Sequence, residues 1–335
     1  MKRFILLILI AILTIPKCVM SQNRKIIMTV NGPVDIQKMG VSLIHEHILV
    51  DFIGAEKYSS DRWDDKKVFE RSIPFLQKIK ELGCQTFVEC TGGYLGRDVL
   101  LLRALSNASG LNIITNTGNY GAGNNKYIPA YAFTETAEQL ANRWIAEWKE
   151  GIDSTGIKPG LIKIGVDGGP LSVMHQKLIT AAAKAHLQTG LVIASHTGPS
   201  VPAFEQIAIL QKEGVSPEAF IWVHAQAERD LEAHVKAARL GAWIGLDGVN
   251  DSNIQEYVVM IQNLKNNNLL NKVLLSHDAG WYDPAKENGG EFRGYTSIFE
   301  KLIPALKEAH FSDAEIHQLL VENPANAFEI RIRKA

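Results

Sequence analysis

The sequence predicts a (β/α)8 TIM barrel of the α/β class, folded as a single domain behind an N-terminal signal peptide. Short apolar runs rich in β-branched residues alternate with longer amphipathic segments from residue 22 onward. Strict alternation of strands and helices implies a parallel sheet. Eight such units, with no linker or low-complexity stretch between them, favour a closed barrel of ~250 residues over an open doubly wound sheet.

The elements follow in order along the chain. The strand candidates are the apolar runs at 41–50, 85–92, 112–118, 160–167, 191–198, 220–225, 242–247 and 272–278. A helical pattern follows each strand, and those at 68–82, 135–151 and 175–190 end near a glycine suited to a C-cap. The last helix is expected at 295–309. The remaining segments are 23–39, a tail at 312–328, and a long loop at 279–294 that we predict to be a lid or specificity loop.

The first 21 residues have the pattern of a secretory signal peptide. Lys2 and Arg3 precede an apolar run that is shorter than the ~20 residues of a membrane-spanning helix. Lipid attachment at Cys18 is the alternative, but the residues before it form a poor lipobox. We expect cleavage after Ser21 and a secreted or periplasmic domain at 22–335 with no membrane span.

Net charge bears on the class of partner, and cysteine spacing bears on whether a disulfide can form. The formal net charge is −1, and loss of Lys2, Arg3 and Lys17 with the signal peptide takes it from −1 to −4. This mild charge argues against nucleic acid as a partner and leaves a small molecule. Cys84 and Cys90 flank the apolar run 85–89 of the second strand candidate and should lie ~20 Å apart, beyond the ~7 Å limit for a disulfide, so we expect that they do not bridge each other.

Two histidines and a glutamate interrupt the first strand candidate. Side chains alternate along a strand, so His45 and His47 should point the same way and Glu46 the other way. Two imidazoles ~6.6 Å apart along one strand can hold one metal ion. Hydrogen-bonded core histidines are an equally good interpretation of this pair alone.

Polar residues recur on four other strand candidates. His196, His224 and Asp278 lie at the C-terminal edge, where the active sites of barrels are found. Lys163 lies in the middle of the fourth candidate, where burial of an ammonium group is costly, and an ion pair with Asp167 is its alternative role. Imidazole and oxygen ligands of this kind suit Zn²⁺, Co²⁺, Mn²⁺ or Fe²⁺.

Together these residues resemble the phosphotriesterase family of the amidohydrolase superfamily. The shared pattern is HxH on the first strand, a lone Lys on the fourth, single His on the fifth and sixth, and the Asp of SHD on the eighth. The segments GRD at 96–98, SHTG at 195–198, IGLD at 244–247 and ENPANAF at 322–328 agree with it. The resemblance covers essentially the whole chain after the signal peptide.

The resemblance implies two divalent metal ions, with zinc as the first expectation. The more buried ion would be held by His45, His47 and Asp278, and the more exposed one by His196 and His224. Lys163, carboxylated to a carbamate, would bridge them together with a hydroxide. Two dications supply four positive charges, which Asp278, the carbamate and the hydroxide reduce by three, whereas an ammonium would add a fifth. The hydroxide would attack the substrate, and Asp278 would accept the proton.

Departures from the family pattern bear on the substrate. The phosphotriesterases proper have an acid three residues after the sixth-strand His and a His after GLD. This chain has Ala227 and Gly248 there, so their proton relay is missing. Lactonases of the family resemble this chain at TGNY, which makes Tyr120 a candidate catalytic residue, with rim packing as its alternative role. Family members are often homodimers, which is an expectation by resemblance.

The expected pocket walls suit an apolar or aromatic substrate body. They comprise Tyr94, Tyr120, Tyr127, Tyr131, Trp281, Tyr282 and Phe292, with Arg293 as a candidate partner for a carboxylate. We therefore predict a binuclear metal hydrolase of carboxylic esters or lactones, with phosphotriesters as a side reaction. The alternatives are an amide hydrolase of the same family and, from another class, a catalytically silent metal- or ligand-binding barrel.

Overall fold

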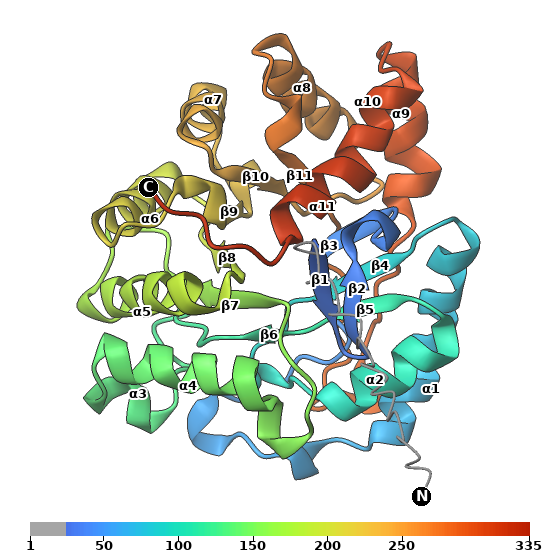
Figure 1. Cartoon of the computed structure of the whole chain (residues 1–335). Coiled ribbons are helices and arrows are strands. Elements are labelled where there is room, and N and C mark those ends of the chain that lie inside the picture. The colour runs from blue at the N-terminus through green and yellow to red at the C-terminus, as the bar shows by residue number, and fades with distance from the viewer. Residues whose placement is uncertain (1–24) are drawn as a thin grey trace, which may run out of the picture.

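The computed structural model describes residues 25–335 of the 335-residue chain. The predicted signal peptide lies outside the described residues, so its cleavage stays a prediction. The described part is a mixed α/β fold in which helices surround the strands (Figure 1). Its strands are β1 (Ile26–Thr29), β2 (Gly32–Asp35), β3 (Ser42–Glu46), β4 (Thr86–Glu89), β5 (Asn112–Ile114), β6 (Asn116–Thr117), β7 (Leu161–Gly165), β8 (Val192–His196), β9 (Phe220–Val223), β10 (Trp243–Leu246) and β11 (Val273–Leu275).

Helices follow the strands in the predicted alternation. They are α1 (Asp65–Glu81), α2 (Val99–Ser109), α3 (Ala130–Thr134), α4 (Ala137–Glu150), α5 (Val173–Thr189), α6 (Ser200–Lys212), α7 (Leu231–Leu240), α8 (Ile254–Asn266), α9 (Ile303–Glu308), α10 (Asp313–His317) and α11 (Asn323–Phe328). A capping box of Thr136 and Gln139 starts α4, and Gly190, in the left-handed conformation, ends α5 as predicted. Within residues 25–335 no helix has the length and apolarity needed to cross a membrane.

The strands from β3 to β11 pair in parallel and follow one another in chain order. One hydrogen-bonded group is β3 to β5 and the other is β6 to β11. The third predicted strand is in two pieces, because the chain leaves β4 at Thr115 and then pairs with β7. Since β11 also lies beside β3, the arrangement is consistent with the predicted barrel.

The first central strand contains a bulge and is shorter than predicted. Its register against β4 shifts by one residue between Leu43 and Glu46. Leu43 packs in the outer core, whereas its neighbour Ile44 packs in the inner core. A bulge of this kind can re-aim a side chain and is common beside active sites. The strand ends before the predicted Val50 because the chain beyond Glu46 pairs with the loop at Tyr282 instead.

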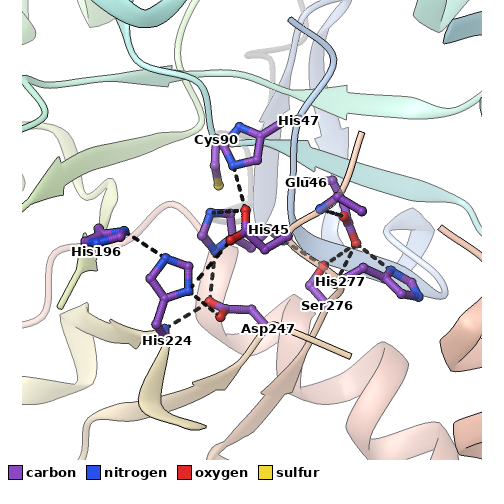
Figure 2. A network of polar contacts seen from close by, with 12 residues as sticks. His45, Glu46, His47, Cys90, His196, His224, Asp247, Ser276 and His277 are labelled. Carbon is purple, nitrogen blue, oxygen red and sulfur yellow. Dashed lines mark hydrogen bonds and ion pairs between the residues drawn. The ribbon is translucent and has the colours of Figure 1, made fainter. Parts of the chain in front are cut away.

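A buried glutamate joins the first and last central strands. Glu46 accepts hydrogen bonds from Ser276 Oγ (2.7 Å) and from the backbone N–H groups of His277 (2.9 Å) and Ala279 (3.0 Å). His277 Nδ1 lies 2.7 Å from the same carboxylate. Figure 2 shows this cluster pointing away from His45, as the alternation of side chains predicted. One carboxylate therefore fixes β3 against the segment that follows β11.

Apolar side chains fill the end of the strands where each strand begins. Ile27 of β1 and Phe328 of α11 belong to the same inner cluster as Leu161 and Trp243, which start β7 and β10. The β1–β2 hairpin is tied to this end by the hydrogen bond from Val30 N to the carbonyl of residue 113. This packing leaves the opposite, carboxyl end of the strands to polar residues.

Candidate metal centre

The six predicted metal-site residues meet at one cavity of about 640 Å³. They come from β3, β7 and β8, from the residues that directly follow β3 and β9, and from the third residue after β11. Because the carboxyl ends of parallel strands share one edge, residues far apart in the chain lie together there. The residues are His45, His47, Lys163, His196, His224 and Asp278.

Asp278 lies among the histidines. Its Oδ1 is 3.0 Å from His47 Nε2 and 3.7 Å from His45 Nε2. Ligand atoms of His45, His224 and Asp278 all lie within 4.8 Å of one another. His196 joins the group through its Nδ1, which is 2.8 Å from His224 Nε2. Without a metal ion, one of these two nitrogens must carry the proton of the hydrogen bond between them.

A second buried aspartate orients two of these histidines. Asp247 accepts from His45 Nδ1 at 2.8 Å through one oxygen and from His224 Nδ1 at 2.7 Å through the other (Figure 2). Both imidazoles therefore carry a proton on Nδ1 and turn a bare Nε2 toward the cavity. The sequence analysis gave Asp247 no role. Its position directly after β10, like that of Asp278 after β11, was the signal that could have identified it.

The orientation of His47 is fixed separately. Its Nδ1 lies 2.8 Å from Thr91 Oγ1, and Thr91 follows β4. The buried Glu89 accepts from the backbone N–H groups of Ile48 and Thr91, so it ties the ends of β3 and β4 together beside this histidine. Burial raises the pKa of the Glu89 carboxyl to about 7.

Two of the site residues have left-handed backbone conformations. His224 has φ 61° and Asp278 has φ 49°, values that are uncommon for residues other than glycine. Hydrogen bonds from the His224 N–H to Asp247 and from the Asp278 N–H to the His45 carbonyl hold these conformations. Backbone strain of this kind is concentrated at functional sites, where the surrounding contacts over-determine it.

Burial and charge set the protonation of the site. Burial lowers the pKa of His45 to about 4, and burial together with His224 lowers that of His196 well below its usual value. Burial also opposes the charged form of His224, but Asp247 outweighs it and raises the pKa. Burial alone would raise the pKa of Asp278, yet His45 and the other imidazoles lower it. Bare imidazole nitrogens and an ionised carboxylate are the forms that ligate metals.

Lys163 is buried with no charged partner among residues 25–335. The alternative ion pair with Asp167 does not form, because Asp167 accepts instead from the backbone N–H groups of Gly123 and Asn124. The neighbour of Lys163 Nζ is the Tyr120 ring, whose centre is 5.5 Å away. Tyr120 also lies 5.2 Å from the His196 ring, so Lys163 and Tyr120 join Asp278 at the centre.

The cavity walls agree only in part with the sequence prediction. Tyr120, Tyr127 and Trp281 line the cavity. The other predicted wall residues do not. Tyr94 and Tyr131 turn toward a separate cavity, where their rings lie 6.3 Å apart. The walls also include apolar residues that the sequence analysis did not select: Val50, Phe52, Leu95, Ala122, Val166 and Pro199.

The long loop at 279–294 folds back on the barrel, which explains why three residues that the sequence analysis assigned to the pocket do not face the cavity. Tyr282 and Phe292 are buried in the outer core, and the Phe292 ring packs 4.7 Å from that of Phe75. Arg293 donates to the backbone carbonyls of His277 and Asp278, so its guanidinium does not face the cavity. The sequence of a loop does not show which of its aromatic and basic side chains face the cavity.

The donor set fits divalent metal ions. Bare imidazole nitrogens, one carboxylate and an unpaired buried lysine converge on a common space, and hydrogen bonds hold the far side of three of the imidazoles. Such outer hydrogen bonds are typical of metal-binding histidines. With metal present, an arrangement of this kind can activate water and polarise an acyl or phosphoryl oxygen.

Comparison with known proteins points the same way. Residues 25–328 match the model of the phosphotriesterase family. The phosphotriesterase homology protein of Escherichia coli (strain K12) is 30% identical over 294 residues, which cover 87% of this chain and 98% of that protein. The aryldialkylphosphatase of Saccharolobus solfataricus is 27% identical over 312 residues (88% and 96%). The N-acetyltaurine hydrolase of Dictyostelium discoideum is 28% identical over 276 residues (78% and 73%).

Proposed function

Because the chain belongs to the phosphotriesterase family, we propose that it is a binuclear metal-dependent hydrolase that cleaves carboxylic esters or lactones. The observation that carries this proposal is the convergence of His45, His224 and Asp278 at one cavity whose other walls are largely apolar. His196 and Lys163 beside them supply the ligands for a second ion. This complete set argues against a catalytically silent barrel.

The two ions, zinc by first expectation, would share the six residues as the sequence predicts. His45, His47 and Asp278 would hold the more buried ion, and His196 and His224 the more exposed one. When bound, the ions would activate a water molecule as nucleophile and polarise the substrate's carbonyl oxygen. The contribution of the chain is to present these ligands with bare nitrogens and to surround the substrate with apolar walls.

Lys163 would bridge the ions as a carbamate. Its burial without an acidic partner supports this assignment, because an ammonium group beside four imidazoles and two cations would be strongly disfavoured. Asp278 would accept the proton released from water at its carboxylate. The neighbouring imidazoles lower its pKa and keep it ionised, which is the form that ligates a metal ion and has a free site for a proton. The Tyr120 ring would orient the acyl group against His196.

The missing relay supports esters and lactones over phosphotriesters. Ala227 lines the cavity and offers no proton acceptor. A Cβ at Gly248 would lie 2.8 Å from Tyr257 Oη and 2.9 Å from Gln226 Nε2, so a relay histidine there would require both side chains to shift. An amide hydrolase is the second candidate, favoured by the name of the Dictyostelium discoideum relative. Amide cleavage demands protonation of the leaving nitrogen, for which the cavity offers few donors.

The test is hydrolysis by the purified protein, metal-replete and chelator-stripped, across lactones, aryl esters, N-acyl amides and one aryl phosphotriester. We expect lactone or ester turnover that disappears on stripping and returns with added metal. His224→Asn should abolish turnover, whereas His317→Asn, an exposed position outside the cavity, should not. Dominant amide turnover would favour the second candidate, and no turnover by the metal-replete protein would refute the proposal.

The carbamate has its own test. Isotope-labelled bicarbonate should give a carbamate signal in the wild type that is absent from Lys163→Ala. Metal binding by Lys163→Ala should recover in part when a short carboxylic acid is added to replace the missing bridge. A wild-type protein that binds two metal equivalents and gives no carbamate signal would remove Lys163 from this role.

A further inference from the structure

The charges around the cavity are unevenly distributed. Among the described residues that line it, Lys163 is the only lysine or arginine, and it lies at the base beside the histidines. The only acids are Asp278, which belongs to the metal centre, and Asp167, which follows β7 at the rim. Among the described lining residues away from the metal centre, the single fixed charge is therefore that of Asp167. Lys126 lies behind this wall, where its Nζ donates to the Phe52 carbonyl at 2.6 Å.

Asp167 is held rigidly and is not neutralised. Its carboxylate accepts from the N–H of Gly123 at 2.7 Å and from that of Asn124 at 3.3 Å, which ties the loop after β6 to the end of β7. Its side chain is 39% exposed, and no lysine or arginine within residues 25–335 forms an ion pair with it. His175 Nε2 lies 3.6 Å away and is directed to the Gly121 carbonyl at 3.2 Å.

The nearby guanidinium cannot serve as a counter-charge for a substrate. Arg293 is occupied by the carbonyl oxygens of His277 and Asp278. Its guanidinium also stacks on the Trp281 ring at 4.7 Å, on a residue that lines the cavity. Because two backbone acceptors and an aromatic face already satisfy it, recruitment of Arg293 to a substrate anion would break these contacts.

The remaining walls are apolar. Val50, Leu95 and Val166 are buried, and Phe52, which is 43% exposed, meets Trp281 with ring centres 6.3 Å apart. These surfaces match an alkyl or aryl substituent and carry no cationic group for a carboxylate, sulfonate or phosphate group.

We propose, on the basis of the proposed function, that the substrate carries an uncharged apolar substituent and that Asp167 excludes analogues with an anionic one. The reasoning is electrostatic. A substituent that extends from the metal centre toward the rim passes the Asp167 carboxylate, which repels a like charge, and no lysine or arginine among the described lining residues lies at this part of the wall to offset it. Burial of a hydrocarbon substituent against the apolar walls, by contrast, lowers the free energy of binding.

The experiment uses two lactones of the same ring and side-chain length, one ending in a methyl group and the other in a carboxylate. We expect the wild type to prefer the neutral lactone in kcat/KM by about tenfold or more, as one like charge roughly 8 Å away in a site of intermediate dielectric predicts. Asp167→Asn keeps an oxygen for the Gly123 N–H and removes the charge. It should raise kcat/KM for the anionic lactone about five- to tenfold and leave the neutral one within about twofold.

Two controls separate this effect from other causes. Asp313→Asn removes a negative charge from a side chain that is 88% exposed on α10, outside the cavity, and should change neither lactone's kcat/KM. In the wild type, added salt should reduce the discrimination because it screens the repulsion. This second measurement tests the inference without any variant, so a poorly folded Asp167→Asn does not block it.

Each outcome has one meaning. Preference for the neutral lactone that falls with salt and with Asp167→Asn supports the inference. Equal or better turnover of the anionic lactone by the wild type overturns the inference and leaves the proposed hydrolase standing. A preference that neither salt nor Asp167→Asn alters removes Asp167 from this role. Turnover of neither lactone by the metal-replete protein overturns the proposed function and this inference with it.

Discussion

Replacement of Asp247 by Asn should weaken both metal subsites at once. Asp247 is fully buried, and its two oxygens accept one hydrogen bond each from His45 Nδ1 (2.8 Å) and His224 Nδ1 (2.7 Å). By family resemblance, these histidines ligate different ions. One carboxylate therefore orients a ligand of each ion, and the two subsites share a single support.

The size of the effect follows from the chemistry of the substitution. An asparagine has one acceptor oxygen, so one of the two imidazoles would face an NH₂ group in place of an acceptor. Loss of such a partner typically costs 10- to 100-fold in metal affinity, which is about 1.4 to 2.8 kcal/mol. Asp247 also accepts from the His224 N–H at 3.1 Å, so the strained backbone at that ligand loses support as well.

Titration of the metal-free protein with Co²⁺, followed by its visible absorption, measures both affinities. We expect Asp247→Asn to weaken both binding steps, and Thr91→Val, which affects only His47, to weaken the tighter step alone. Thermal denaturation of the metal-free variants checks that both remain folded. The reasoning fails if Asp247→Asn binds two equivalents of Co²⁺ as tightly as the wild type, or if it weakens one step only.

Three further predictions concern groups that are not themselves proposed metal ligands. Glu46→Ala leaves the donors of Ser276 and His277 without a partner in a buried site. The free energy of unfolding, measured in urea, should therefore fall by about 3–5 kcal/mol. A loss under about 1 kcal/mol would contradict the role of Glu46 in joining the strands. Burial lowers the pKa of His186 from 6.5 to about 4, so the unfolded chain takes up a proton in this range that the folded chain does not. Stability should therefore fall by roughly 3 kcal/mol on this account as pH drops from 6.5 to 4, and His186→Asn should flatten that slope; an unchanged slope would count against it. Burial raises the pKa of the Cys84 thiol to about 12 and also raises that of Cys90. A thiol reagent should therefore label neither cysteine until the protein unfolds. Rapid labelling of the native protein would refute this prediction.

Local sequence patterns predicted most of the fold and the candidate metal ligands. The alternation of apolar strands and amphipathic helices depends on burial periods that each segment shows by itself, and the structure confirms that alternation. Active sites of barrels lie at the carboxyl ends of the strands, so the positions of His196 and Asp278 near strand ends predicted that they would share one edge. The structure places both at the same cavity. Cys84 and Cys90, the cysteines of the described residues, are free, as their expected spacing along one strand predicted.

Only the tertiary structure decided what the site residues touch. Asp247 and His45 are 202 positions apart, and Glu46 and Ser276 are 230 apart, so no local pattern links either pair. The inward or outward direction of a loop side chain depends on how the loop packs, which is why Trp281 faces the cavity and Phe292 does not. Periodicity therefore determined which residues could meet at the edge of the sheet. Long-range hydrogen bonds and the packing of loops, which are properties of the closed chain, determined their orientation and the charge that a substrate meets.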